Sequence, residues 1–360
     1  MNEIEKITAT LGSAYELVND SVLLQLEDYK ISIRSNSHKL LKQLENYFSH
    51  TLGNGAADIE IVAIEREAPE LDLSFIDWKR EPGKSGRKDS YIDLKGGRLV
   101  RKVRTGMIFL QSKDHLIAAG PCIANDNQLI NYINSQYMNY LQQQGALICH
   151  AAAASFKGDC LAIAGFSGGG KSTLMLNLLE HEDVAYLTND RLFLKRSGEG
   201  LTAKGIPKLP RINPGTIMNN DRLCSILPEA RKAELSFLSK EELWDVEEKY
   251  DVFPEQVYGP EKIVSKARLG ALLILNWQRD SVDACDIKQV DINERRDLLQ
   301  AVMKSPGPFY QYPDASFYRD DTVLDDRPYL ALLGEVEIYE ATGKVDFEFA
   351  SRYCLEHIIH

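Results

Sequence analysis

The chain has 360 residues, of which 44% are apolar and 26% charged, and its net charge is −11. This composition is typical of a globular protein and excludes an intrinsically disordered chain. A length of this order accommodates two domains. The negative charge argues against a nucleic-acid-binding protein, which needs a basic surface to neutralise phosphates.

The sequence also argues against secretion and membrane insertion. Glu3, Glu5 and Lys6 interrupt the N-terminal segment, which therefore lacks the basic flank and apolar run of a signal peptide. No apolar run approaches the roughly 18 residues that a membrane-spanning helix needs. The six cysteines show no C-x-x-C spacing, which predicts reduced core thiols. We therefore expect a cytoplasmic protein with no membrane or nucleic-acid partner.

Residues 1–125 are expected to form an N-terminal α+β domain that carries no nucleotide signature. A helix is predicted over Ser37–Leu52, where leucines recur at helical spacing. A basic region over residues 79–104 predicts the solvated face of a hairpin, with docking of an acidic partner as the alternative. Short β-rich runs predict strands at Val22–Leu26, Tyr29–Ile33, Ile59–Ile64, Ser90–Asp93, Met107–Gln111 and His115–Ala119.

The second domain is expected to span residues 126–360, and a one-sided apolar helix over residues 127–143 is expected to open it. From Gly145 onward, short apolar runs alternate with glycine or helical segments, which is typical of an α/β sheet. The polar insertion Pro207–Pro260 is interpreted as a substrate-binding or lid segment. Strands are predicted at Leu147–Ala153, Cys160–Ala164, Val184–Leu187 and Leu269–Leu275, and helices at Leu174–Leu179 and Phe347–His357.

One motif in the second domain predicts a ligand. A strand, a glycine loop and a helix follow one another, and the loop reads G-x-x-x-x-G-K-S-T over Gly165, Phe166, Ser167, Gly168, Gly169, Gly170, Lys171, Ser172 and Thr173. Glycines bring successive N–H groups close to phosphates without a Cβ in the way. Lys171 is expected to reach the β- and γ-phosphates, and the Ser172 hydroxyl to bind Mg²⁺. The motif therefore predicts ATP and Mg²⁺ as cofactors.

The residues around the loop narrow the class of nucleotide-binding protein. Neither an N-K-x-D motif nor a D-x-x-G switch follows Ser172, which argues against a GTPase, and no L-S-G-G-Q-type signature of a transport ATPase is present. The next strand ends in Asn189-Asp190-Arg191, so Asp190 is the candidate Mg²⁺ ligand or base, with a simple turn as the alternative. His150 is a second candidate, although an isolated histidine is more often structural.

The segment from His150 to Leu194 resembles the catalytic domain of the HPr kinase/phosphorylase family, and the layout is most like the HPr-kinase-related kinases of subgroup B. In that family a histidine stands fifteen residues before a G-x-S-G-x-G-K-S loop, as His150 does before Gly165, and an acid-acid-arginine triplet closes the next strand. The resemblance implies an α/β, P-loop kinase core of the HPr-kinase and PEP-carboxykinase-like type. It also implies a bacterial enzyme that assembles into a homo-oligomer and an ATP-grasp enzyme system as a partner.

Two departures from the family bear on the chemistry. Asn189 occupies the place of the family's general base, and an amide cannot take a proton at neutral pH. The family's E-x-R-G signature is also absent near Ala203-Lys204-Gly205, which leaves HPr insecure as the substrate. Arg268, at the place of the family's arginine-bearing loop, is expected to face the transferring phosphoryl group, with Arg191, Arg211, Lys208, Lys262 and Lys266 as the alternatives.

The leading hypothesis is an ATP- and Mg²⁺-dependent kinase that transfers the γ-phosphoryl group to a hydroxyl, either a protein serine or a small molecule. Its catalytic residues would be His150, Asp190, Asn189 and Arg268. The alternative is a nucleotide-binding regulatory module, or an ATPase switch, that lacks phosphotransfer.

Overall fold

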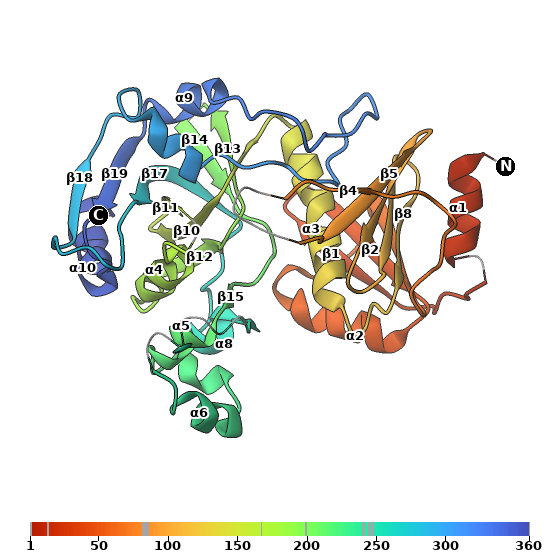
Figure 1. Ribbon diagram of the computed structural model, residues 1–360, viewed down its shortest axis with the longest axis horizontal. Helices are drawn as coiled ribbons and strands as arrows, with labels where there is room; N and C mark the ends of the chain where they lie inside the picture. Colours follow the sequence, from red (N-terminus) through yellow and green to blue (C-terminus); the bar gives the residue numbers. More distant parts are fainter. Residues whose placement is uncertain are drawn as a thin grey trace. The chain divides into compact units, whose positions relative to one another are not determined.

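The computed structural model describes residues 2–12, 14–80, 86–166, 168–198, 200–239, 242–243, 246 and 248–359 (Figure 1). Two compact units share the chain. Unit 1 comprises Met1–Gly145 and Ser305–Val323, and unit 2 comprises Ala146–Lys304 and Leu324–His360. We call Ser305–Val323 the return segment. Within the described residues, no helix is long and apolar enough to cross a membrane.

Unit 1 is built on an eight-stranded mixed sheet in the order β1-β2-β3-β8-β7-β6-β5-β4. The strands are β1 (Ser21–Leu26), β2 (Tyr29–Ser35), β3 (Ile59–Glu65), β4 (Ile76–Asp77), β5 (Asp89–Leu94), β6 (Gly97–Lys102), β7 (Ile108–Ser112) and β8 (Leu116–Gly120). The pairs β2–β3 and β3–β8 are parallel and the other pairs are antiparallel. All six predicted strands are confirmed, while β4 and β6 were not predicted.

The helices of unit 1 are α1 (Glu3–Gly12), α2 (His38–Tyr47), the 3₁₀ turn η1 (Ser49–Thr51) and α3 (Asp126–Gln143). Helix α1, which was not predicted, buries Ile4 and Leu11 among apolar residues of the sheet. Helix α2 begins at His38, with Ser37 as its N-cap, and ends at Tyr47, so it is shorter than the predicted helix over Ser37–Leu52.

The boundary between the units differs from the one expected after residue 125. Helix α3 was expected to open the second domain, but it belongs to unit 1. Its buried Tyr132 donates a hydrogen bond of 2.6 Å to the carbonyl of Leu110 on β7, so the helix is fixed to this sheet. The one-sided apolar pattern of α3 predicts a buried face but does not say which sheet covers it.

The return segment is held to unit 1 by Arg98, whose side chain is fully buried. The Arg98 guanidinium binds both carboxylate oxygens of Asp93, at 2.5 and 3.0 Å. It also donates hydrogen bonds to the carbonyls of Pro308 and Tyr318, at 3.1 and 2.9 Å. Because both carbonyls lie in the return segment, one cation secures a stretch of chain that is remote in sequence. The prediction that residues 79–104 form a solvated face is therefore wrong at Arg98.

Aromatic rings complete the surroundings of Arg98. Its guanidinium carbon lies 4.6 Å from the ring centroids of Tyr91 and Phe317 and 5.6 Å from that of Trp78. Such cation–π contacts are strongest when the cation is removed from water. A buried arginine needs this combination of ion pair, hydrogen bonds and ring faces to offset its loss of hydration.

Unit 2 is built on a nine-stranded sheet with the main order β12-β10-β11-β17-β14-β13-β9, in which β19 pairs with β17 and β18. The strands are β9 (Leu147–Cys149), β10 (Ala151–Phe156), β11 (Asp159–Gly165), β12 (Val184–Thr188), β13 (Leu192–Ser197), β14 (Gly200–Lys204), β17 (Lys266–Leu275), β18 (Asp286–Gln289) and β19 (Glu337–Thr342). A separate two-stranded sheet pairs β15 (Arg211–Ile212) with β16 (Tyr250–Asp251). The strands predicted in this unit are confirmed, except that the predicted run over Leu147–Ala153 breaks at His150.

Helices cover both faces of the large sheet, as in a three-layer α/β arrangement (Figure 1). Leu161 and Ile163 of β11 face a core that includes helices α4 and α10, whereas Cys160 and Ala162 face a core that includes η3 and α9. The helical elements of unit 2 are α4 (Lys171–Leu178), α5 (Pro214–Met218), η2 (Leu223–Ile226), α6 (Glu229–Leu235), α8 (Pro254–Tyr258), η3 (Arg296–Ala301), α9 (Arg327–Leu333), α10 (Phe347–Tyr353) and the π-helical turn η4 (Cys354–Ile358).

We predict that Arg98→Met loosens the return segment. The change leaves two carbonyls without their donor and removes the ring contacts, which destabilises the fold by roughly 2–4 kcal/mol. Hydrogen exchange measured by mass spectrometry should show lower protection of residues 305–323. The matched control is Arg87→Met, which removes only an exposed ion pair with Asp77 and should leave the exchange unchanged. Equal protection in both variants would show that Arg98 does not hold the segment.

Candidate functional site

Strand directions gather the predicted site residues at one edge of the sheet in unit 2. Strand β11 runs parallel to β17, with Gly165 paired to Leu275, so both strands end together. Strand β10 is antiparallel to β11 and begins at Ala151, opposite Ala164. Strand β12 is antiparallel to β10 and therefore runs in the same direction as β11. The glycine loop after β11, the polar residues after β12 and His150 before β10 consequently lie at the same edge, where open α/β sheets bind ligands.

The glycine loop has the backbone conformation that a phosphate cradle needs. Gly168 and Gly170 have φ values of 78° and 84°, a region that residues with a Cβ rarely occupy. A Cβ on Gly170 would also overlap the ring of Phe347. The Gly169 N–H donates to the Phe166 carbonyl at 3.0 Å, which closes a turn. Ser167 lies outside the described residues.

Two aromatic residues that sequence reasoning missed support this loop. The indole Nε1 of Trp277, just after β17, donates a hydrogen bond of 2.8 Å to the Gly169 carbonyl. The Trp277 ring meets the Phe347 ring edge to face, with centroids 5.2 Å apart. Phe347 in turn occupies the space beside Gly170. The sequence does show a tryptophan just after a predicted core strand. Its contact with the glycine loop follows only from the pairing of β17 with β11, which the sequence does not reveal.

Helix α4 begins at Lys171, with Gly170 as its N-cap. The free N–H groups at such a helix start favour an anion. The Lys171 ammonium donates to the Gly165 carbonyl at 3.2 Å, so it lies against the loop that it is expected to serve. Ser172 occupies the second position of the helix, and the Thr173 hydroxyl lies 3.1 Å from that of Thr216 on α5.

His150, Asp190 and Arg191 form a connected group. The His150 Nε2 lies 3.0 Å from Asp190 Oδ1, and the Arg191 guanidinium binds Asp190 Oδ2. The backbone of His150 is also fixed, because its N–H donates to the Val302 carbonyl at 2.7 Å. The side chains of His150 and Asp190 are 26% and 39% exposed, so the pair is partly open to solvent. The structure thus brings together two candidates that are forty positions apart in the sequence.

The charges of this group follow from its surroundings. Burial of the imidazole lowers the pKa of His150, and the Lys171 and Lys304 ammonium groups lower it further against the opposing effect of Asp190. Burial alone would raise the pKa of the Asp190 carboxyl. The Arg191 guanidinium, the hydrogen bond from His150 and the charge of Lys208 outweigh it and hold that pKa well below its usual range. At neutral pH the group therefore holds an uncharged imidazole and an ionised carboxylate.

Lys208 is a second cation beside Asp190. The Tyr186 hydroxyl on β12 donates a hydrogen bond of 2.5 Å to the Lys208 carbonyl, which ties the residue to the strand that leads to Asp190. Burial lowers the pKa of Lys208 to about 8, and the guanidinium groups of Arg191 and Arg211 add to this effect against Asp190 and Asp251. The protein therefore keeps an ammonium group in surroundings that disfavour its charge.

The side-chain oxygen of Asn189 is buried and accepts no hydrogen bond. An unsatisfied buried acceptor is costly and calls for a donor from a ligand, a substrate or water. Asn189 immediately precedes Asp190 and shares its edge of the sheet. This unsatisfied oxygen, together with the conformation of the glycine loop, fits a site that a phosphorylated ligand and a hydroxyl donor complete.

The structure does not bring Arg268 to this edge. Arg268 pairs with Asp159 at the start of β11, while Gly165 pairs with Leu275 at the far end of the same two strands. Six residues of strand separate the two ends, which is about 20 Å at ~3.3 Å per residue. The Arg268 side chain forms an ion pair with Asp159. Its predicted contact with the transferring phosphoryl group is therefore not supported, because strand direction places the residue at the opposite end.

Lys262 is also a structural residue and not a phosphate ligand. Its ammonium donates hydrogen bonds to four carbonyls that follow or end helix α4, those of Leu179, His181, Glu182 and Val184. These bonds tie together the turn that connects helix α4 to strand β12.

The candidate metal ligands are the Ser172 hydroxyl and the Asp190 carboxylate. Among the described residues, no group of three or more His, Cys, Asp or Glu side chains could hold a metal ion. Mg²⁺ commonly takes one or two protein oxygens and completes its shell with phosphates and water. The donor set of one hydroxyl and one carboxylate fits that mode of binding.

The comparisons with known proteins add little to this geometry. No protein-family model matches the chain, and no curated protein matches it. Among solved structures, the Hpr(Ser) kinase/phosphatase from Coxiella burnetii matches with a TM-score of 0.30 and 10% sequence identity. The match covers 58% of this chain and 89% of that one. The function proposed below consequently rests on the site itself.

We predict that Lys208→Met stabilises unit 2 at pH 7 in spite of its place in the site. The folded state releases the Lys208 proton near pH 8, whereas the unfolded chain keeps it up to about pH 10.4. Below pH 8 the folded protein carries the full cost of the buried charge, on the order of 1–3 kcal/mol. Between these two pH values the unfolded state binds more protons, so the wild type gains stability as pH rises and the advantage of the variant shrinks.

Urea unfolding from pH 7 to 10.5 measures this difference. The exposed residue Lys195 on β13 provides the control, and Lys195→Met should leave the stability unchanged. A Lys208→Met protein that is less stable than the wild type at every pH contradicts the account of Lys208.

Proposed function

We propose that unit 2 is an ATP- and Mg²⁺-dependent kinase that transfers the γ-phosphoryl group to a hydroxyl of a protein serine or a small molecule. The single observation that carries the proposal is the meeting of the glycine loop and the His150–Asp190 pair at one edge of the sheet. A phosphate cradle alone would serve any nucleotide-binding protein. The adjacent imidazole–carboxylate pair adds groups that can orient and deprotonate an acceptor.

In this proposal the loop and helix α4 hold the donor. The N–H groups around Gly168 and Gly170 bind phosphate oxygens, and Lys171 exchanges its Gly165 carbonyl for the β- and γ-phosphates. Mg²⁺, held by Ser172 and Asp190, would neutralise charge on the phosphates. Catalysis of this kind relies mainly on position and charge, because the transition state for phosphoryl transfer is loose.

His150 is the better candidate for the base. The lowered pKa of its imidazole leaves it uncharged and able to accept a proton at neutral pH. Asp190 is a weak base, because its pKa is held well below the usual range and both of its oxygens are already engaged. The carboxylate would instead stabilise the imidazolium that forms when His150 takes the proton. The unsatisfied oxygen of Asn189 would accept a hydrogen bond from the acceptor hydroxyl.

Arg191 and Lys208 take the role first expected of Arg268. Both cations interact with Asp190 at the edge that holds the glycine loop. Positive charge at this place would stabilise the charge that builds up on the transferring phosphoryl group.

The second candidate is a nucleotide-binding regulatory module or ATPase switch without phosphotransfer. The observation that favours it is the engagement of both Asp190 oxygens, one by His150 and one by Arg191. If this arrangement persists when nucleotide binds, the carboxylate is a poor metal ligand.

Incubation of the full chain with γ-labelled ATP, Mg²⁺ and a lysate of its source organism tests the proposal. We expect a labelled acceptor whose labelling falls at least about a hundredfold in Lys171→Ala, because the loop then lacks its charged donor. The exposed-site variant Lys195→Ala should label normally. Full transfer by Lys171→Ala refutes the proposal. Tight ATP binding without transfer supports the regulatory module, and phosphate release without an acceptor supports the switch.

We further predict that Asn189→Asp adds a phosphorolytic activity, in which inorganic phosphate takes the phosphoryl group from the product and leaves as pyrophosphate. The new carboxylate adds a second group beside His150 that can return a proton to the acceptor oxygen, which an amide cannot do. Release of pyrophosphate from the isolated labelled product measures this activity. If the parent chain is an active kinase and Asn189→Asp is inactive in both directions, the assignment of Asn189 to the acceptor is wrong.

A further inference from the structure

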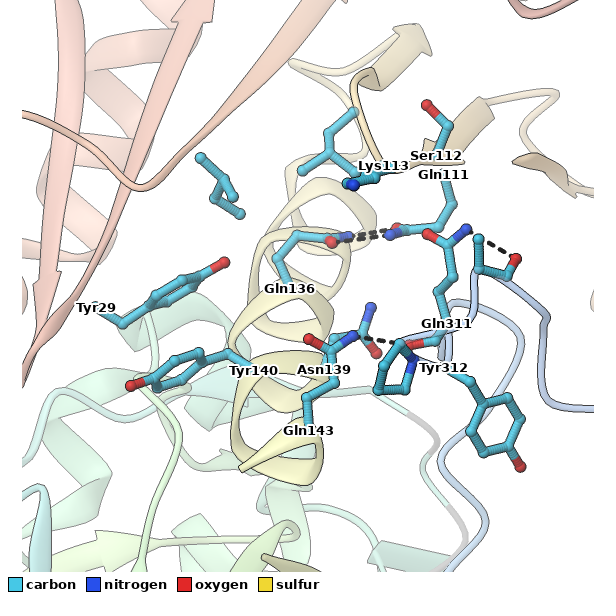
Figure 2. A pocket seen from close by; sticks show the side chains of 14 residues that line it. Tyr29, Gln111, Ser112, Lys113, Gln136, Asn139, Tyr140, Gln143, Gln311 and Tyr312 are labelled. Carbon is cyan, nitrogen blue, oxygen red and sulfur yellow. Dashed lines mark hydrogen bonds between the residues drawn. The ribbon is translucent and has the colours of Figure 1, made fainter. Parts of the chain in front are cut away.

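Unit 1 contains a groove that has no part in the proposed kinase chemistry. Its volume is about 360 Å³, and its walls come from α3, the β7–β8 turn, the start of β2 and the return segment (Figure 2). All of its lining residues belong to unit 1. We call it the amide groove because five carboxamide side chains line it, those of Gln111, Gln136, Asn139, Gln143 and Gln311.

A reciprocal pair of glutamines lies at the centre of the amide groove. Gln111 donates to the Gln136 side-chain oxygen at 3.1 Å, and Gln136 donates to that of Gln111 at 2.7 Å (Figure 2). The two residues are only 3% and 4% exposed. Gln136 donates its second N–H to the Tyr132 carbonyl at 3.4 Å, so the pair leaves one N–H of Gln111 and one acceptor lone pair on each side-chain oxygen for a further partner.

The other carboxamides hold the return segment as one wall of the groove. Asn139 donates to the Phe309 carbonyl at 2.8 Å, and Gln143 donates to the Gln311 carbonyl at 2.9 Å. Gln311 donates to the Ala315 carbonyl at 3.1 Å. Each bond uses one N–H of its carboxamide, and every side-chain oxygen retains a lone pair for another donor. The wall is therefore fixed while its amides can still bind a ligand.

The carboxamides of α3 follow a line along the helix. Gln136, Asn139 and Gln143 lie three and four positions apart, so they share one face. Gln143 lies seven positions after Gln136, which is a rise of about 10.5 Å along the helix. This is the length of about three residues of extended chain, at ~3.3 Å each. A linear ligand that offers donors and acceptors in alternation matches this arrangement.

The charge and the rings of the groove restrict the ligand further. Lys113 is the one charged side chain among its lining residues. Tyr29 and Tyr140 are stacked at 4.2 Å with an interplanar angle of 8°, and Tyr137 lies 6.4 Å from Tyr29 on a similar plane. Burial raises the pKa of Tyr29 to about 12, so its hydroxyl stays uncharged. The groove is therefore poorly suited to phosphates, and stacking among the tyrosines occupies ring faces that a sugar would use.

We propose that the amide groove binds a short extended peptide segment without charged side chains, mainly through the backbone amides of that peptide. Peptide groups are neutral and present one donor and one acceptor per residue in a line. Glutamine and asparagine side chains offer the same two groups in return. The proposal does not depend on the kinase activity proposed for unit 2.

The probe is a pool of tetrapeptides with acetylated N-termini and amidated C-termini, built from uncharged residues. Equilibrium dialysis against the full chain, with mass spectrometry as the readout, identifies the peptides that bind. The decisive variant is the double change Gln111→Leu and Gln136→Leu, which removes both amides together and so leaves neither one unpaired. Binding of the selected peptides should weaken at least about tenfold, since about two hydrogen bonds are lost.

Two further variants separate this proposal from folding defects and from the kinase. Gln143→Leu changes an exposed side chain and should weaken peptide binding about threefold, which decides the matter if the double variant fails to fold. Lys171→Ala should bind the selected peptides as the wild type does, even if it loses phosphotransfer. The proposal is overturned if no peptide is retained, if the leucine variants bind as well as the wild type, or if glucose or N-acetylglucosamine binds where the peptides do not.

Discussion

The parallel pairing of β11 with β17 is the constraint on which the candidate site depends. Because Gly165 stands opposite Leu275, the chain leaves both strands at the same edge and passes into the glycine loop on one side and Trp277 on the other. The hydrogen bond from Trp277 to the Gly169 carbonyl then fixes the loop. The same register places Arg268 opposite Asp159, at the far end of both strands. Strand direction alone thus brings the glycine loop and Trp277 to the site and keeps Arg268 and Asp159 away from it.

The ionisable groups at this edge of the sheet are held in different charge states by their surroundings. Asp190 is ionised because cations surround it, while Lys208 retains its charge against burial and His150 stays neutral. Such pairs of groups, whose surroundings push their pKa values apart, are typical of sites that move protons. The cost of keeping Lys208 charged has no evident benefit for the fold. In the proposed function, this cation would help to hold the phosphates.

Local patterns predicted much of the fold and of the site, and long-range contacts account for what they missed. The glycine loop, its flanking strand and helix, and Asp190 were accessible because each is encoded by neighbouring residues, whereas His150 was singled out by the family resemblance. Arg98 was misjudged, since its basic neighbours suggested a solvated hairpin and its partners in the return segment lie more than two hundred positions away. Helix α3 was placed in the wrong unit because an apolar face does not name the sheet that it covers. Arg268 was wrongly placed in the site because the resemblance to the family did not show at which end of the strand this residue lies.

The return segment links the two units through the chain itself. Val302 accepts the backbone hydrogen bond of His150, and Lys304 lowers the pKa of that imidazole. The next residue, Ser305, begins the segment that Arg98 and the carboxamides of the amide groove hold in unit 1. The chain thus passes directly from residues that contact His150 in unit 2 to the return segment of unit 1.

A crystal structure of the full chain with Mg²⁺ and a non-hydrolysable ATP analogue tests the central claim most directly. The account predicts the β-phosphate within hydrogen-bonding distance of the backbone N–H groups from Gly168 to Ser172. It also predicts that Lys171 has turned from the Gly165 carbonyl to the phosphates and that the γ-phosphate faces His150 and Asp190. A nucleotide bound away from this loop, or a γ-phosphate directed away from the His150–Asp190 pair, would contradict it.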